Sequence, residues 1–360
     1  MKIFIICHSL THGGAERVGA NLANGFAQEG HNVTLFTDLS RPITYPLEEN
    51  IHLCPLGTGS NKILKWFRTI HAIRKRTERE RPDVIIGMMH LCSFIGRIAA
   101  AFQPILSVLT IHHAIAPHLV RYSLTTRLAD RWLPLLYPCV TVLTEADRCY
   151  YGNNRHIHVM PNPLTYFPVE NIPPKEKIIL AAGRLSDIYV KGWDLLIEAW
   201  SMVAADFPDW RLVLAGDGNE KSMHTIHQMI ADRGVERQTF LIGYQSDLLP
   251  WFQRSAVYIL SSRSEGLPMV LLEAMSQGCA CLATDNNGRT ADIITNMKEG
   301  LICQPHARSI AQTLFQLLND DALRIRLQQG AIQRSHHYHP RLIIQLWERL
   351  IISQIKKRQS

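Results

Sequence analysis

One stretch, Val257–Thr284, restricts the fold of this chain more than any other part of its sequence. It begins and ends with short β-branched and apolar runs, Val257–Leu260 and Cys279–Ala283, which predict two buried strands. Between them, Pro268 suits the first position of a helix, because its φ is fixed and no N–H is needed there. Gly278 suits the left-handed residue that ends a helix. The stretch therefore predicts a β–loop–α–β unit, the building block of an α/β fold.

Two acidic residues of this unit are candidates for a functional role. Glu265 lies in the predicted loop before the helix, and Glu273 lies within the helix on the stripe that carries Met269 and Gln277. The opposite, buried stripe is expected to consist of Val270, Leu271, Ala274, Met275 and Gly278. The first helical N–H groups, around Leu267–Val270, have no partner within the helix and suit an anion such as phosphate. The alternative is that Glu265 only complements the helix dipole and that Glu273 is solvated.

The rest of the chain alternates strands and helices in two rounds. In the first half, buried strands are predicted at Lys2–Cys7, His31–Thr37, Pro82–Gly87, Ile105–Ile111 and Val140–Leu143. In the second half they are predicted at Lys177–Ala182, Trp210–Leu214 and Phe240–Gly243, besides the two strands of the opening stretch. The proline-rich segment Tyr166–Glu176 is expected to link the halves. A length of 360 residues also favours two domains.

Composition excludes several classes of protein. The eight cysteines are scattered without a CxxC pair, which argues against a disulfide framework or a structural zinc site and favours a reducing compartment. The apolar start of the chain is too short for a signal peptide, and no run is long enough to span a membrane. The glycine loop after the first strand contains only Gly13 and Gly14, so it lacks the GxGxxG fingerprint of NAD-dependent dehydrogenases.

Positive charge is concentrated in one predicted helix. The formal net charge is +7, and Asn61–Arg81 carries eight lysines and arginines against Glu78 and Glu80. Its apolar residues are spaced for one helical face: Ile63, Leu64, Trp66, Phe67, Ile70 and Ile73. Such a helix can lie on an anionic membrane surface, or it can cover a sheet and hold its basic face in water. The two interpretations are compatible.

Several residues lie in loops at the carboxyl ends of predicted strands, where open α/β sheets bind their ligands. The pair Gly13–Gly14 allows a phosphate to approach the backbone or simply makes a tight turn. Arg184 and Lys191 flank one loop and can bind the two phosphates of a diphosphate, or they are surface charges. His112 and His113 follow another strand.

The motifs EGLPMVLLE followed by AMSQG, GRLS…KGWDLLIEA, and VMPNP at the junction of the two halves resemble those of glycosyltransferase family 4. This resemblance covers nearly the whole chain and implies the GT-B architecture: two facing Rossmann-like, doubly wound α/β domains with a cleft between them. The implied domains are 1–165, with the C-terminal helix 341–360 packing back on it, and 166–340, which binds the nucleotide sugar.

The resemblance also implies roles for individual residues. Glu273 is expected to bind the ribose of the nucleotide, and Glu265 with the amides of Gly266–Met269 is expected to hold the sugar hydroxyls. His112 matches the family's sugar-binding histidine best, with His113 as the near alternative. We therefore expect Glu265 and His112 to be catalytic, Glu265 by positioning in the transition state. The expected donor-binding residues are Gly13, Gly14, Arg184, Lys191, Gly266, Leu267, Pro268, Met269, Val270 and Glu273.

The expected activity is transfer of a hexose or N-acetylhexosamine from a UDP-sugar with retention at the anomeric carbon. The sequence has no DxD motif, so cations and backbone amides are expected to stabilise the leaving diphosphate without a metal or other cofactor. The expected acceptor is a glycan or lipid-linked glycan in surface-polysaccharide or lipopolysaccharide assembly. The expected location is the cytoplasmic face of the inner membrane, held peripherally by Asn61–Arg81, with no nucleic-acid partner. Alternatives are a nucleotide-sugar epimerase of the same fold and a non-catalytic protein that binds anionic surfaces.

Overall fold

The chain divides into two compact units, which we describe separately. The computed structural model describes residues 1–11, 13–57, 62–113, 123–152 and 154–359. Unit 1 contains the described residues up to Pro163 and the C-terminal residues from Pro340. Unit 2 runs from Leu164 to His339.

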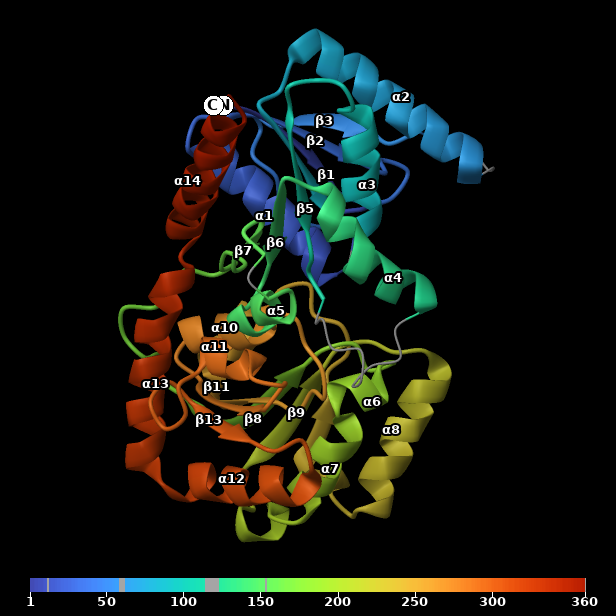
Figure 1. Cartoon of the computed structure of the whole chain (residues 1–360). Helices are drawn as coiled ribbons and strands as arrows, with labels where there is room; N and C mark the ends of the chain where they lie inside the picture. The colour runs from blue at the N-terminus through green and yellow to red at the C-terminus, as the bar shows by residue number, and fades with distance from the viewer. Residues whose placement is uncertain (12, 58–61, 114–122, 153, 360) are drawn as a thin grey trace. The chain divides into compact units, whose positions relative to one another are not determined.

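Unit 1 is built on a seven-stranded parallel sheet with the order β3-β2-β1-β4-β5-β6-β7 (Figure 1). The order reverses between β1 and β4, as in a doubly wound fold. The strands are β1 (Lys2–Ile6), β2 (Asn32–Thr37), β3 (His52–Pro55), β4 (Val84–Met88), β5 (Leu106–Thr110), β6 (Cys139–Val142) and β7 (Ile157–Val159). Most of their residues are buried, which explains why they read as near-continuous apolar runs in the sequence.

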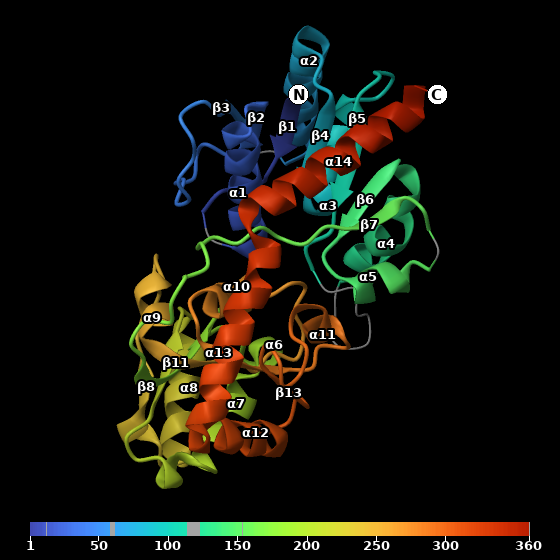
Figure 2. The same ribbon diagram turned by 90° about the vertical axis from the view of Figure 1, so that its left-hand side faces the viewer.

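The helices of unit 1 include one from the far end of the chain. They are α1 (Gly14–Gln28), α2 (Lys62–Glu80), α3 (Met89–Ala99), α4 (Leu124–Trp132), the 3-10 helix Leu133–Leu136, α5 (Glu145–Tyr150) and α14 (Pro340–Gln359). Figure 2 shows α14 running beside α1. A Cβ atom at Gly25 of α1 would lie 2.5 Å from Ile344 Cγ1, so this glycine allows the two helices to approach closely. His31 Nε2 lies 2.6 Å from Glu348 Oε1 beside this contact.

Helix α2 only partly matches the predicted single apolar face. Trp66, Ile70 and Ile73 pack against the core of the sheet, as expected. Leu64 and Phe67 are instead 52% and 67% exposed, so the prediction that they share the buried face is wrong. The side chain of Ile63 lies outside the described residues. The outer surface of α2 therefore carries apolar as well as basic groups.

Unit 2 repeats the doubly wound order with six parallel strands, β10-β9-β8-β11-β12-β13. These are β8 (Glu176–Ala182), β9 (Arg211–Ala215), β10 (Thr239–Leu241), β11 (Ser255–Leu260), β12 (Ala280–Thr284) and β13 (Leu301–Cys303). The α-helices are α6 (Ile188–Lys191), α7 (Trp193–Ser201), α8 (Glu220–Asp232), α9 (Leu249–Arg254), α10 (Met269–Ser276), α11 (Arg289–Ile293), α12 (Ala307–Asn319) and α13 (Asp321–Ser335). The 3-10 helices are Ala204–Asp206, Glu236–Gln238 and His336–Tyr338. Trp193, Trp200 and Leu214 belong to its hydrophobic core.

The predicted elements are confirmed, with shifted boundaries and some omissions. Pro268 is the N-cap of α10 rather than its first residue, because the helix begins one residue later than predicted, at Met269. Gly278 has the expected left-handed φ of 72°. Three strands were not predicted from the sequence: β3, β7 and β13, each only three or four residues long. Among the described residues, no helix is both long enough and apolar enough to span a membrane.

Candidate functional site

The predicted diphosphate residues of unit 2 lie where its strand order reverses, between β8 and β11. The loop after β8 carries Arg184, and the short helix α6 after it ends at Lys191. The loop after β11 carries Ser262 and Glu265. Because parallel strands end at the same edge of the sheet, the two loops meet there, and this reversal is the place where doubly wound folds bind ligands.

Hydrogen bonds to backbone carbonyls hold these two loops together. Ser261 Oγ donates to Lys191 O at 2.9 Å, and Arg263 N donates to Val190 O at 2.8 Å. Gly192 has φ 66°, and a Cβ atom there would lie 2.0 Å from Ser261 O. A residue other than glycine would separate the loops, so Gly192 permits the contact that brings Lys191 to Glu265.

The result is a polar cluster centred on Glu265. Lys191 Nζ lies 2.7 Å from Glu265 Oε1, and Ser262 Oγ donates to the same oxygen at 2.6 Å. The side chains of Lys191 and Glu265 are 22% and 14% exposed, so this ion pair is weakly screened by water. Arg184 differs: its side chain is 73% exposed and lies 3.6 Å from Asp187. The two predicted cations are therefore held differently, with Lys191 fixed and Arg184 extending into solvent.

Arg263 supports the cluster and was not identified from the sequence. Its guanidinium makes a two-pronged ion pair with Asp194, at 2.8 and 2.7 Å, and stacks on the Tyr189 ring at 4.2 Å. The hydrogen bonds with Asp194 raise the pKa of Arg263 above its usual value. Both partners flank Lys191 in the sequence, so Arg263 fixes the helix end that carries this lysine.

The start of α10 lies in the same connection as Glu265. The Leu271 N–H donates to Pro268 O at 3.1 Å. The N–H groups of Met269 and Val270 come before Leu271 in the sequence, so they lie at the positive end of the helix. Leu267 and Met269 are buried, whereas Gly266 and Val270 are half-buried. Five of the residues predicted to bind the donor, Gly266–Val270, thus lie in the connection from β11 into the start of α10.

The predicted exposed stripe of α10 is wrong. Glu273 is 0% exposed, and Met269 and Gln277, which share its stripe, are also buried. Val270, assigned to the buried stripe, is the half-exposed residue. The cause is that α10 is enclosed on nearly all sides, so its sequence has no contrast between two faces. A solvated Glu273 is therefore excluded, and its carboxylate belongs to the interior of unit 2.

In unit 1, Gly13 and Gly14 connect β1 to α1, which begins at Gly14. The Gly13 N–H donates to Tyr45 Oη at 3.1 Å. A Cβ atom at Gly13 would meet the carboxylate of Glu16, whereas a Cβ atom at Gly14 would have open space around it. The Glu16 side chain therefore fills the space that the missing Gly13 side chain leaves, and an anion approaching this turn has to displace it.

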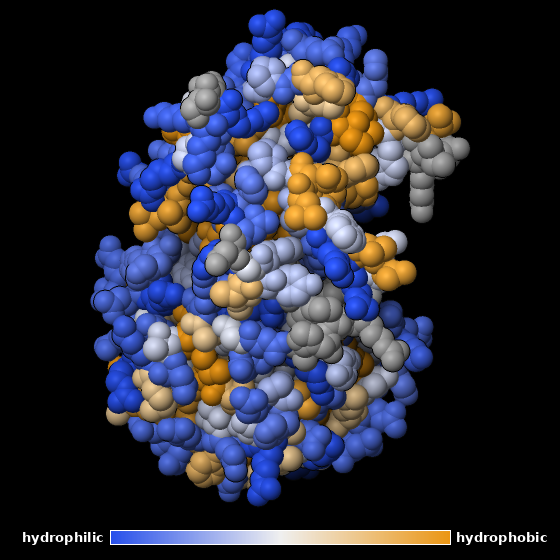
Figure 3. Space-filling view, in the orientation of Figure 1, coloured by the Kyte–Doolittle hydropathy of each residue, from blue (hydrophilic) through white to orange (hydrophobic). Residues whose placement is uncertain are grey.

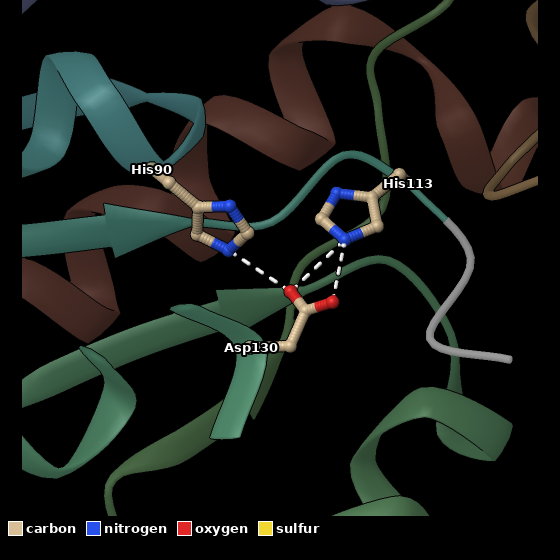
Figure 4. Close-up of side chains that lie close together, drawn as sticks. All are labelled: His90, His113 and Asp130. Atoms are coloured by element: carbon tan, nitrogen blue, oxygen red, sulfur yellow. Dashed lines mark hydrogen bonds and ion pairs between the residues drawn. The ribbon is translucent and has the colours of Figure 1, made fainter. Parts of the chain in front are cut away.

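The two histidines after β5 have different surroundings. Both ring nitrogens of His112 are shielded from solvent, and burial lowers its pKa to about 4. His113 Nε2 instead contacts Asp130 at 2.9 and 3.1 Å (Figure 4). His90 Nε2 lies 3.0 Å from the same carboxylate. No sequence pattern indicated His90 or Asp130, because nothing in the sequence relates residues so far apart.

Two family models match consecutive parts of the chain. The model described as Glycosyltransferase Family 4 matches residues 12–165, and the model described as Glycosyl transferases group 1 matches residues 164–334.

Named relatives match over most of the chain. It is 30% identical to the lipopolysaccharide core biosynthesis glycosyltransferase LpsE of Rhizobium meliloti, over 88% of this chain and 89% of that protein. It is 25% identical to a Campylobacter jejuni alpha-1,4-N-acetyl-D-galactosaminyltransferase, over 98% of both chains. Among solved structures, Anabaena HepE in complex with UDP and glucose matches with a TM-score of 0.81 at 16% identity, covering 98% of this chain and all of that one. The chain therefore belongs to the group 1 and family 4 glycosyltransferases, and its two parallel-sheet units have the GT-B fold.

Proposed function

We propose that the protein transfers a hexose or N-acetylhexosamine from a UDP-sugar to a lipid-linked glycan, with retention at the anomeric carbon. The observation that carries this proposal is the cluster of Lys191, Ser262 and Glu265 beside the start of α10, at the reversal of strand order in unit 2. The other residues are assigned around this cluster.

The diphosphate of the donor binds Lys191, Arg184 and the first amides of α10. Without donor, Glu265 holds Lys191 at 2.7 Å, so binding requires the ammonium to turn toward the phosphates. Arg184 is exposed enough to close over them. Each charged hydrogen bond contributes about 1.5–3 kcal/mol, and the helix end about 0.3–1 kcal/mol. These groups stabilise the leaving diphosphate without a metal ion at this site.

Glu273 binds the ribose. A buried carboxylate is costly unless polar groups surround it, and the two ribose hydroxyls can both donate to it. Its burial at 0% exposure supports a role inside the site rather than at the surface.

The sugar is transferred on one face. The bond from C1 to the phosphate oxygen breaks, the acceptor oxygen bonds to C1 on the same side, and the acceptor proton passes to the departing phosphate oxygen. No side-chain base is needed; Glu265 orients the sugar hydroxyls, and His112, neutral at physiological pH because burial lowers its pKa, binds the sugar. The alpha linkage in the name of the Campylobacter relative supports retention, since UDP-hexoses carry an alpha-linked sugar.

The acceptor is membrane-linked, and unit 1 has a surface that suits it. The name of the Campylobacter relative includes PP-undecaprenol. Apolar side chains are exposed along α3, as Figure 3 shows, and along α2, α4 and the 3-10 helix Leu133–Leu136. They are Leu64, Phe67, Leu91, Phe94, Ile98, Leu124, Leu128, Trp132, Leu135 and Leu136. Arg68, Lys75, Arg127 and Arg131 are exposed on α2 and α4. Apolar groups among cations favour an anionic bilayer surface.

Sedimentation with vesicles tests this surface. We expect the protein to bind vesicles that contain phosphatidylglycerol better than neutral vesicles, and the double variant Leu64→Ser/Phe67→Ser to bind less. The variant Ile325→Ser, which changes an exposed apolar residue on α13, is the control. Equal binding of all three proteins would contradict the membrane assignment.

Turnover with a panel of UDP-sugars tests the reaction. We expect UDP release to require an undecaprenyl-diphosphate-linked acceptor, and NMR of the product to show an alpha linkage. Conversion of a UDP-sugar to its epimer without acceptor would favour the epimerase alternative. A beta-linked product would contradict retention.

A further inference from the structure

Three metal-ligating side chains converge in unit 1, at the edge where its strands end. His90 is the second residue of α3 and follows β4, His113 follows β5, and Asp130 lies on α4. Figure 4 shows the two imidazole rings pointing toward the carboxylate between them. One ring nitrogen of each histidine and one carboxylate oxygen of Asp130 all lie within 4.8 Å of one another. Three separate elements thus contribute ligand atoms around one point.

The three side chains are largely removed from water. Their exposures are 17% for His90, 15% for His113 and 7% for Asp130. Asp130 Oδ1 lies 3.0 Å from His90 Nε2 and 2.9 Å from His113 Nε2, so one oxygen faces both rings. Tyr151 Oη donates to the backbone carbonyl of Asp130 at 3.0 Å, which fixes this part of α4.

A second observation marks the same place. Met89, immediately before His90, has a φ of 66°, a left-handed conformation that is costly for a residue other than glycine. Such strain persists where the surrounding structure over-determines the conformation, and it is frequent at ligand sites. Here it sets the direction in which α3 starts, and therefore the position of the His90 ring.

We propose that His90, His113 and Asp130 bind one divalent transition-metal ion, and that their chemistry suits zinc. Two imidazoles and a carboxylate are a ligand set that zinc uses where it keeps a fourth position open. Magnesium and calcium prefer oxygen ligands, so this set disfavours them.

The geometry requires only small adjustment. Bonds of about 2.0–2.2 Å around a tetrahedral zinc ion place neighbouring ligand atoms roughly 3.3–3.6 Å apart. The present nitrogen-to-oxygen separations of 2.9–3.1 Å are slightly shorter, because hydrogen bonds from His113 and an ion pair with His90 now join these atoms to Asp130. Binding exchanges these bonds for metal ligation, and an Nε2 that carries a proton must release it or transfer it to the other ring nitrogen. The ion then fastens the ends of β4 and β5 to α4 and leaves one position for water.

These three residues belong to unit 1, whereas the residues of the donor cluster belong to unit 2. The absence of a DxD motif therefore says nothing about this site. The competing interpretation is that the three side chains form only a hydrogen-bonded network that holds α4 in place.

Zinc titration of the untagged full-length chain, first stripped with a chelator, separates the two interpretations. We expect one zinc ion per chain with a Kd below about 1 µM. The cobalt-substituted protein is expected to show the intense visible absorption of a four-coordinate site. The variants His90→Gln, His113→Gln and Asp130→Asn should each weaken binding more than about 100-fold, because even loss of an outer-shell partner costs 10- to 100-fold.

The matched control is His52→Gln, which changes an exposed histidine on β3 of the same unit and should bind zinc like the wild type. Thermal unfolding with and without zinc checks folding independently: zinc should raise the midpoint of the wild type and of the control only. The proposal is overturned if the wild type binds no zinc at micromolar concentration. It is equally overturned if tight binding survives in all three ligand variants.

Discussion

Replacing Lys191 by alanine perturbs the proposed diphosphate site most directly. Lys191 Nζ is held 2.7 Å from Glu265 and is 22% exposed, so its contact with a phosphate oxygen would be a weakly screened, charged hydrogen bond. Loss of one such bond costs about 1.5–3 kcal/mol. We therefore expect kcat/KM for the UDP-sugar to fall by about 10- to 150-fold, since each 1.36 kcal/mol is a factor of ten in rate.

The assay is steady-state release of UDP, with circular dichroism and thermal unfolding to show that the fold is intact. The control is Lys177→Ala, which removes an exposed lysine from the opposite end of β8 and should retain wild-type kinetics. The variants Glu265→Gln and Lys191→Ala/Glu265→Gln complete a double-mutant cycle, which separates direct loss of the cation from disturbance of Glu265. Wild-type kcat/KM in Lys191→Ala would refute the diphosphate assignment.

Three further predictions address other parts of the molecule. Glu273→Gln should mainly raise the KM for the UDP-sugar, because its carboxylate is fully buried and assigned to the ribose; an unchanged KM would remove that role. Gly192→Ala should lower the free energy of unfolding in urea by at least about 1–2 kcal/mol, the cost of a left-handed φ alone, since its Cβ also meets Ser261 O; an unchanged midpoint would contradict the loop geometry. Asp38 has its pKa lowered to about 2, first by the hydroxyl of Ser40 and then by Lys65. Because the folded pKa lies below the unfolded one, its stabilisation is present above about pH 4 and is lost as the pH falls toward 2. Asp38→Asn should therefore cost about 1–2 kcal/mol at pH 6 and much less at pH 2, measured by denaturant unfolding at each pH.

Much of the fold could be predicted because neighbouring elements of the fold are also neighbours in the sequence. The strand, loop, helix and strand of Val257–Thr284 are adjacent in sequence, and proline and glycine mark the helix ends through backbone geometry alone. The meeting of Lys191 with Glu265 could also be expected, since both follow strands at one edge of a parallel sheet. The short edge strands β3, β7 and β13 could not be predicted, because three or four residues are too few to show a periodic pattern of apolar side chains.

Burial and long-range contacts could not be predicted from the sequence. Glu273 has a helical spacing typical of an exposed face, and only the enclosure of α10 shows that it is buried. Leu64 and Phe67 on α2 show the reverse, since apolar spacing does not reveal which side of a helix meets a core. The convergence of His90 on α3 with Asp130 on α4 depends on the tertiary structure, which no local sequence pattern records.

The most direct test of the central claim is a crystal structure of the protein with UDP, grown in the presence of a chelator. We predict that the two phosphates contact Lys191 Nζ and the first amides of α10, that Glu273 contacts the ribose, and that Lys191 no longer pairs with Glu265. UDP bound elsewhere, or bound at this place only through an added metal ion, would contradict the account.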